Sequence, residues 1–224
     1  MSRAHSTDEL LRTEQRRVES YRLLTQGYRE PDRELFETIE DSANDLYDFD
    51  LERLASAMPE SVETARVDFA KLFVGPFEMR APPYGSVYLD RTDRVMTEST
   101  RDVRAAYRRE GLEVTLDEPA DHLAAELEFL YVLVVTEGEA LDSGDEDAAI
   151  QYLDRQYEFL SEHLGRWVSE FAAEVREHAE TEFYWVLADE TQRFLEADVD
   201  RLADRRDRIR TDDAGLVEVV IDEN

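Results

Sequence analysis

The chain of 224 residues contains no cysteine, which excludes disulfide bonds, thiolate metal sites and cysteine nucleophiles. It also has no apolar run near the length of about eighteen residues that a membrane-spanning helix needs. The first ten residues, MSRAHSTDEL, lack the apolar stretch and the small-residue cleavage site of a secretory signal. We therefore expect neither secretion nor stable insertion into a membrane.

Positive charge is scarce, and almost all of it is arginine. Lys71 is the only lysine, and 26 basic residues stand against 55 acidic ones, which gives a net charge of −29. The acids are spread over every segment, so they favour a surface adapted to very high salt over a surface that binds a cationic partner. Either way, binding to the phosphates of a nucleic acid is disfavoured. At about 1 M salt the Debye length is about 3 Å, so charged partners must be recognised at contact distance.

The sequence lacks the glycine-rich motifs of dinucleotide and P-loop sites and the Gly-x-Ser-x-Gly motif of hydrolases. Of the four histidines, His122 has the most suggestive setting, EPADHLAAE. Asp121, His122 and Glu126 are one candidate metal or catalytic centre, because residues four apart share a helix face. A centre of this kind normally needs a second acid–histidine pair, and none is found. The other interpretation is that Asp121 and His122 stabilise a helix N-terminus, and we expect no metal, no cofactor and no enzymatic activity.

Apolar residues at helical spacing, separated by glycine and proline, predict an all-α fold. We expect a single multi-helix bundle domain over residues 1–210 and an acidic C-terminal tail over 211–224. The opening helix is expected over 7–28, with Ser6 and Glu9 at capping-box spacing. Other helices are expected to start near Pro31, Leu51, Pro59, Ser99 and Pro119, and to cover 146–163, 166–178 and 180–208. Trp167, Phe171 and Trp185 are among the core candidates, and the run LVEVVI at 216–221 has a β-like pattern.

The segment 75–92, GPFEMRAPPYGSVYLDRT, breaks the helical pattern with three prolines and two glycines. We expect an irregular loop there, with Ser86–Leu89 as a short extended piece. Solvent loops are usually polar, but this one carries several apolar and aromatic side chains: Phe77, Met79, Tyr84, Val87 and Tyr88. Such a composition indicates a loop that packs over other elements or forms one wall of a pocket.

Three segments, in order and with compatible spacing, resemble the TorD/DmsD family of redox-enzyme maturation chaperones. They are DFAKLFVGP (68–76), APPYGSVYLDR (81–91) and EPADHLAAELEFL (118–130), the last of which is similar to the family signature Glu-Pro-x-Asp-His at the start of a helix. The resemblance extends from about residue 10 to about residue 140. It implies a cytoplasmic helical chaperone of TorD-like fold that binds the twin-arginine signal peptide and catalytic subunit of a molybdopterin oxidoreductase, most similar to the DMSO or TMAO reductase branch.

In such chaperones, cofactor insertion is assisted and export is delayed until the enzyme is mature. The resemblance implies that the peptide-binding residues are Phe69, Leu72, Phe73, Phe77, Tyr84, Tyr88, Arg91, Glu118, Pro119, Asp121 and His122. The chemistry is compatible, because a twin-arginine signal presents two guanidinium groups followed by an apolar run. Carboxylates form bidentate contacts with guanidinium groups, and an aromatic groove accommodates the apolar run.

Some alternatives stay open at this point. Phe69, Leu72 and Phe73 are most simply explained as core residues, whereas packing and ligand contact explain Tyr84 and Tyr88 equally well. The chain is a monomer or a domain-swapped dimer, and an acidic adaptor without a peptide groove is a further possible function.

Overall fold

A computed structural model describes residues 2–41, 46–75, 78–91, 97–114 and 118–221. Within these ranges the fold is all-helical, as predicted, and the only β pairing is an isolated bridge between Tyr84 and His122. None of the described helices combines the length and the apolar character required to span a bilayer.

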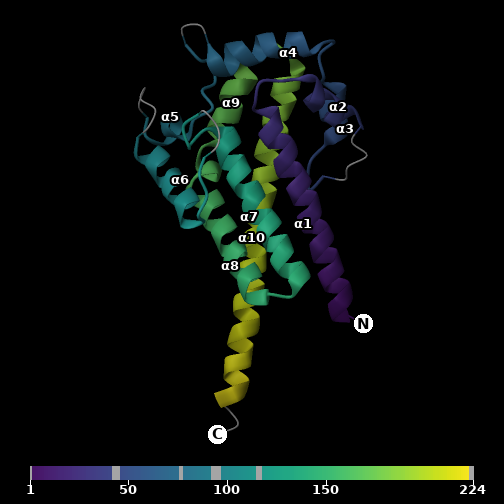
Figure 1. The fold of residues 1–224 in the computed structure, drawn as a ribbon, viewed down its shortest axis with the longest axis vertical. Coiled ribbons are helices and arrows are strands. Elements are labelled where there is room, and N and C mark those ends of the chain that lie inside the picture. The colour runs from purple at the N-terminus through teal and green to yellow at the C-terminus, as the bar shows by residue number, and fades with distance from the viewer. Residues whose placement is uncertain (1, 42–45, 76–77, 92–96, 115–117, 222–224) are drawn as a thin grey trace.

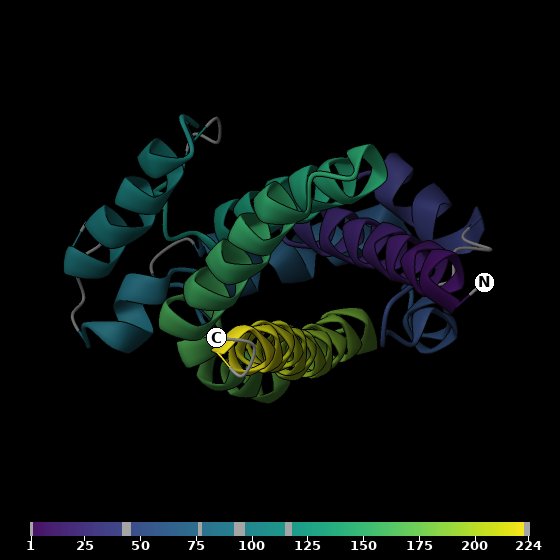
Figure 2. The same ribbon diagram turned by 90° about the horizontal axis from the view of Figure 1, so that it is seen from below.

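Four helices run along the long axis of the molecule: α1 (Ser2–Gly27), α7 (Leu123–Ser143), α8 (Glu146–Glu162) and α10 (Glu182–Ile221). Helix α9 (Val168–His178), preceded by a 3-10 turn at Leu164–Arg166, packs against α10. The short helices α2 (Arg33–Asp41) and α3 (Leu51–Ser56) lie on one side of this bundle, and α5 (Gly85–Leu89) and α6 (Glu98–Arg109) lie on the opposite side (Figures 1 and 2). Helix α4 (Val62–Phe69) covers one end.

Local signals explain most of these boundaries. Ser61 and Asp145 accept hydrogen bonds from the backbone N–H groups of Thr64 and Ala148, at 3.3 and 3.0 Å, and so cap α4 and α8. Helix α4 continues into a π-helical turn, Ala70–Val74, which ends at Gly75 as predicted. The φ of Gly75 is 62°, and a Cβ there would lie 2.5 Å from the Glu78 carbonyl oxygen, so only glycine fits.

Several predicted helix boundaries are wrong. Helix α1 already begins at Ser2, because no residue before Ser6 is a glycine or a proline that would interrupt it, and Ser6 is therefore not its cap. Helix α6 begins at Glu98, close to the predicted start near Ser99, and the Asp90 carboxylate accepts the backbone N–H of Ser99 in its first turn at 3.3 Å. The sequence predicts the end of the helix that follows Pro119 near Gly138, but Gly138 lies within α7, which ends where Gly144 adopts a left-handed φ of 78°.

The tail and one core residue also differ from the predictions. The β-like run at 216–221 is part of α10, which extends beyond the end of the bundle (Figure 1). A helical backbone satisfies its own hydrogen bonds, whereas an unpaired strand does not. Trp167 and Phe171 are buried as expected, but 37% of Trp185 is exposed, with the Arg53 guanidinium 5.0 Å from its ring centroid.

A buried ionic cluster joins α1 to α8 and α10. Arg17, which is fully buried, donates from Nε and Nη2 to the two carboxylate oxygens of Asp198 at 2.6 and 2.8 Å. Its Nη2 also donates to Gln156 Oε1 at 2.7 Å, and the Tyr21 hydroxyl donates to Asp198 at 2.7 Å. Because an unpaired charge at this depth would cost about 3–5 kcal/mol, the cluster fixes which faces of these helices meet.

Candidate functional site

The loop before α5 and the residues before α7 lie against each other. The backbone N–H of Gly85 donates to the Asp121 carbonyl at 2.9 Å, and the N–H of Leu123 donates to the Pro83 carbonyl at 2.8 Å. These two bonds form the bridge between Tyr84 and His122 and bring together the second and third sequence blocks, 81–91 and 118–130. The first block joins them where the Ala81 N–H donates to the Leu72 carbonyl at 2.9 Å.

Asp121 holds the start of α5. Its Oδ2 atom accepts the backbone N–H of Ser86 at 2.8 Å, and its carbonyl oxygen accepts that of Gly85. These contacts satisfy N–H groups of the first turn, which have no partner inside the helix. The prediction of an extended piece at Ser86–Leu89 is therefore wrong, since a carboxylate from a distant segment stabilises a helical turn. Asp121 is completely buried and acts on the loop backbone.

His122 is the cap of α7, although the sequence placed the helix start at Pro119. Its Nδ1 accepts the backbone N–H of Ala124 at 3.1 Å, and its ring lies 5.2 Å from the ring of Tyr84 in an edge arrangement. Burial lowers the pKa of His122 to about 4, against the opposing effect of the nearby Glu118 and Asp121 carboxylates. The imidazole is therefore neutral at pH 7, as an acceptor at Nδ1 requires.

An exposed carboxylate stands at the edge of this site. Glu118 is exposed, and its Oε2 accepts a hydrogen bond from the hydroxyl of the half-buried Tyr84 at 2.8 Å. Burial of Tyr84, and then this bond to a carboxylate, raise the pKa of the tyrosine hydroxyl well above its usual range. Tyr84 and Glu118 thus offer an aromatic surface and a negative charge next to each other.

Tyr88 faces the interior. Its ring stacks on Trp167 with centroids 5.5 Å apart and lies 6.3 Å from Phe171, whose ring is 5.9 Å from that of Phe73. Phe73 also contacts Phe69, at 5.2 Å. The first and second sequence blocks therefore meet around Trp167, which follows the 3-10 turn, and Phe171 of α9, two residues that the sequence identified only as core candidates.

A buried polar layer lies beneath the loop. Glu126 is 1% exposed, and burial, followed by the charge of Asp121, raises its pKa well above the usual range. A Cβ on Gly85 would lie 3.0 Å from Trp167 Nε1 and 3.2 Å from Glu126 Oε1, so the loop backbone rests directly on these two side chains. The requirement for glycine here comes from this close approach.

The structure distributes the predicted peptide-binding residues over three environments. Leu72, Phe73, Tyr88, Asp121 and His122 are buried, which agrees with the core interpretation for Leu72 and Phe73. Phe69, Tyr84 and Pro119 are half-buried, while Arg91 and Glu118 are exposed. Phe77 lies outside the described residues.

The alternative metal centre finds no support in the geometry. The Nδ1 of His122 and the Oδ2 of Asp121 are occupied by backbone N–H groups, and Glu126 lies under the loop against Trp167. Within the described ranges, no three histidine, aspartate or glutamate residues are arranged to hold a metal ion.

Sequence reasoning missed Asp68 as a positioning residue. It is 1% exposed, and its carboxylate accepts the backbone N–H groups of Glu180 and Thr181 at 3.1 and 2.8 Å and the Thr181 hydroxyl at 2.6 Å. It therefore holds the start of α10 beside the first block. The available signal was an acid inside an apolar helix face, in the segment DFAKLF.

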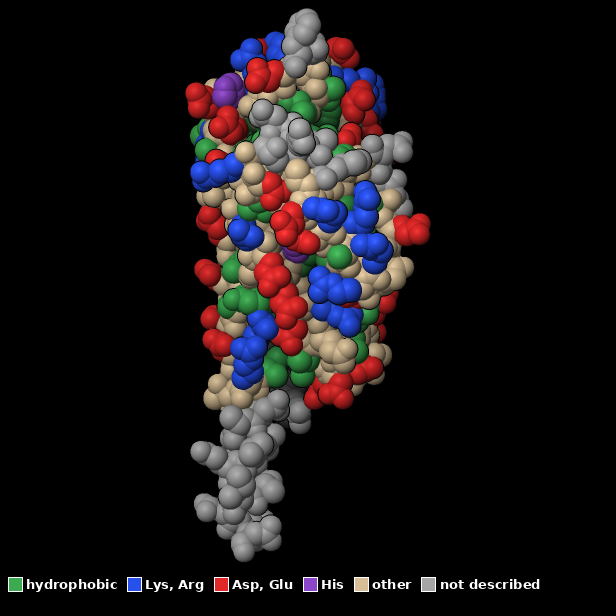
Figure 3. Space-filling model, turned by 90° about the vertical axis from the view of Figure 1, so that its left-hand side faces the viewer, with side chains coloured by type: hydrophobic (Ala, Val, Ile, Leu, Met, Phe, Trp, Pro, Cys, Tyr) green, Lys and Arg blue, Asp and Glu red, His purple; other side chains and the backbone are tan. Residues whose placement is uncertain are grey.

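The side of the molecule that carries α5 and α6 is mainly polar. Acidic and basic side chains are interspersed on it, and hydrophobic side chains form small separate areas (Figure 3). Of the aromatic residues of the second block, Tyr88 is buried and Tyr84 is half-buried.

Comparison with known proteins agrees with this arrangement. Residues 27–173 match the family described as nitrate reductase delta subunit, a range that includes all three sequence blocks as well as Trp167 and Phe171. The chain is 30% identical over 138 residues to the chaperone protein TorD of Aliivibrio salmonicida, covering 61% of this chain and 63% of that protein. It is 34% identical over 137 residues to the TorD of Vibrio vulnificus, covering 60% and 61%.

The match thus spans about three fifths of the length of these curated relatives. In fold, the chain is similar to the crystal structure of an Archaeoglobus fulgidus protein assigned to redox enzyme maturation. The TM-score is 0.55 at 22% identity, over 80% of this chain and 93% of the other. The chain therefore belongs to the TorD/nitrate reductase delta family of redox enzyme maturation chaperones.

Proposed function

We propose that this protein is a non-enzymatic cytoplasmic chaperone. It binds the twin-arginine signal peptide of a molybdopterin oxidoreductase, of the DMSO or TMAO reductase type, assists cofactor insertion and delays export. The observation that carries the proposal is the junction of the three sequence blocks, with Tyr84 and Glu118 bonded to each other at its surface.

The two exposed elements of the junction suit the two parts of such a peptide. Glu118 provides a carboxylate that accepts a bidentate contact from a signal arginine. Tyr84 and the half-buried Phe69 provide aromatic surface for the apolar run that follows. Asp121 and His122 act indirectly, because they hold the loop and the start of α7 in place.

The buried aromatic layer suggests how more apolar surface becomes available. Tyr88 belongs to a five-residue helix, and its stacking on Trp167 holds that helix against the bundle. Displacement of α5 would uncover Tyr88 and Trp167 for the apolar part of a client. The cost of ordering a flexible peptide offsets much of the gain, so we expect an affinity of about 1 μM.

Fluorescence anisotropy with a labelled peptide that carries paired arginines and a leucine-rich stretch tests the proposal. At about 1 M KCl, interactions between distant charges are screened, so the measured affinity reports interactions at contact distance. Glu118→Gln is expected to weaken binding by about tenfold, the typical effect of one charge-assisted contact, and Tyr84→Ala by about the same factor because it removes aromatic surface. A twin-lysine peptide should bind the wild type more weakly, because an ammonium group does not form the bidentate contact.

Glu52→Gln is the matched control, because Glu52 is an exposed acid on α3, on the opposite side of the molecule (Figure 1). It should bind the peptide as tightly as the wild type does. Unchanged affinity in both site variants would refute this binding site. Retrieval of a molybdoenzyme precursor by the purified protein identifies the client, and retrieval of a different class of enzyme would refute the DMSO or TMAO assignment.

A further inference from the structure

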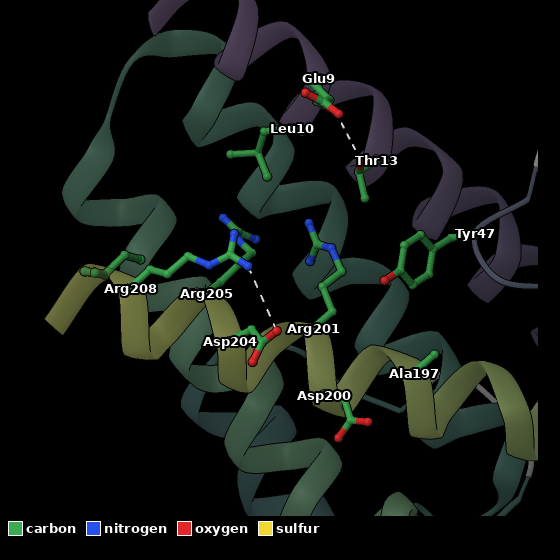
Figure 4. Close-up of a pocket in the computed structure, with 11 residues that line it drawn as sticks. Glu9, Leu10, Thr13, Tyr47, Ala197, Asp200, Arg201, Asp204, Arg205 and Arg208 are labelled. Carbon is green, nitrogen blue, oxygen red and sulfur yellow. Dashed lines mark hydrogen bonds and ion pairs between the residues drawn. The ribbon is translucent and has the colours of Figure 1, made fainter. Parts of the chain in front are cut away.

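A cleft lies far from the junction of the three sequence blocks, between the N-terminal half of α1 and the C-terminal half of α10. Its volume is about 760 Å³, which falls within the range of small-molecule sites. Tyr47, Leu10 and Ile209 supply apolar and aromatic walls, and most of the remaining lining is polar or charged, including three arginines of α10 (Figure 4).

The arginines are Arg201, Arg205 and Arg208, at helical spacings of four and three, which place them on one face of α10. All three side chains extend from α10 into the space below α1, whereas Asp200 points away from it (Figure 4). Three converging guanidinium groups are unusual here, because acids outnumber basic residues by 55 to 26 in the chain. Repulsion between them must be offset by negative charge.

Buried carboxylates below the cleft provide part of that charge. Arg201 and Arg205 both pair with Glu14, and Arg205 pairs with Glu137 at 2.5 Å. Burial, and then the charge of Glu14, raise the pKa of Glu137, which weakens its contribution. These ion pairs engage Nη2 of Arg201 and Nη1 of Arg205, one nitrogen of each guanidinium group.

One donor in the cleft is left over. The Nη1 of Arg201 is buried and has no hydrogen-bond partner within the described residues. The Cζ atom of the same guanidinium group lies 5.8 Å from the centroid of the Tyr47 ring. Arg208 is 78% exposed at its side chain and reaches Asp204 only at 4.0 Å. The acids on the rim, Glu9, Asp200 and Asp204, are exposed, so solvent screens them better than it screens Arg201 and Arg205, whose side chains are 12% and 15% exposed.

We propose that this cleft binds a small molecule through a phosphoryl group, held by Arg201, Arg205 and Arg208, with its apolar part against Tyr47. Guanidinium groups match the geometry of phosphate oxygens by paired N–H donors. A terminal phosphate or pyrophosphate group carries more than one negative charge at pH 7, which suits three converging cations better than a single carboxylate. The site is independent of the proposed peptide site.

Calorimetric titration of the full-length protein with sodium pyrophosphate, at about 0.15 M NaCl, tests the proposal. We expect saturable binding with one site per chain and no binding of acetate at the same concentrations. Arg208→Gln removes an exposed arginine without uncovering a buried carboxylate, and should weaken binding by about tenfold. Arg201→Lys keeps the charge but removes the paired donors, and should also weaken binding.

The matched control is Arg210→Gln, because Arg210 is an exposed arginine of α10 that does not line the cleft. It should bind pyrophosphate as the wild type does. Absence of saturable binding to the wild type, or equal weakening in the Arg208 and Arg210 variants, would overturn the proposal. Tyr84→Ala should leave pyrophosphate binding unchanged. The pyrophosphate titration and the peptide assay therefore test the two sites independently.

Discussion

The neutral His122 makes the stability of this protein depend on pH in a way that one substitution isolates. Its pKa in the folded chain is about 4, below the ordinary value of 6.5, so the unfolded chain binds the extra proton first as pH falls. The stability that His122 contributes is therefore complete above pH 6.5 and is lost as pH falls from there towards 4. Between about pH 7.5 and about pH 5, the expected loss is about 2 kcal/mol in the free energy of unfolding.

Asparagine is a suitable replacement, because it caps helices as an acceptor but does not titrate. Urea unfolding of the wild type and of His122→Asn at both pH values gives the comparison. The wild type should lose about 2 kcal/mol more than the variant on acidification, since all carboxylates are common to both proteins. An equal loss in both proteins, or an NMR titration of His122 with a midpoint near 6.5, would refute the reasoning.

Three further substitutions test the contacts that support the site. Gly85→Ala brings a Cβ within 3.0 Å of Trp167 Nε1 and should cost about 1–3 kcal/mol, so unchanged stability in urea would contradict the close packing of the loop. Arg17→Met leaves the Asp198 carboxylate buried without its partner and should lower the unfolding free energy by about 3–5 kcal/mol. The loss should be the same in urea unfolding at about 1 M salt, because salt does not screen a buried charge. Asp68→Ala removes the acceptor at the start of α10 and should cost about 1–2 kcal/mol, visible as faster amide exchange in that turn.

The helical class and most helix ends could be predicted from the sequence because their causes are local. Apolar spacing, Gly75 and the capping residues act within a few positions of the chain. Prediction failed where a carboxylate from outside a helix accepts the backbone N–H groups of its first turn, because the sequence does not show which segments lie close together. Gly85–Leu89 is helical because Asp121 accepts the N–H of Ser86, and the N–H of Ser99 in the first turn of α6 is bonded by the carboxylate of Asp90 from outside the helix.

The candidate site, too, was only partly predictable from the sequence. The sequence identified the blocks that meet, and the structure confirms that Pro83–Ser86 lies against Asp121–Leu123. It could not separate Tyr84, which remains half-exposed, from Tyr88, which stacks on Trp167. The two tyrosines have similar neighbours in the chain, and only a residue about eighty positions later buries one of them.

By itself, the sequence determined that this chain is a helical member of its family, that it has no cysteine chemistry, and that acidic residues outnumber basic ones by 55 to 26. Only the tertiary structure decided which of its charged residues face solvent and which hold other elements in place. Glu118 and Asp121 are three residues apart, yet the first is exposed beside Tyr84 and the second is buried against Ser86. The physical reason is that burial and pairing depend on segments brought together by folding, whereas helix formation depends mainly on neighbours in the chain.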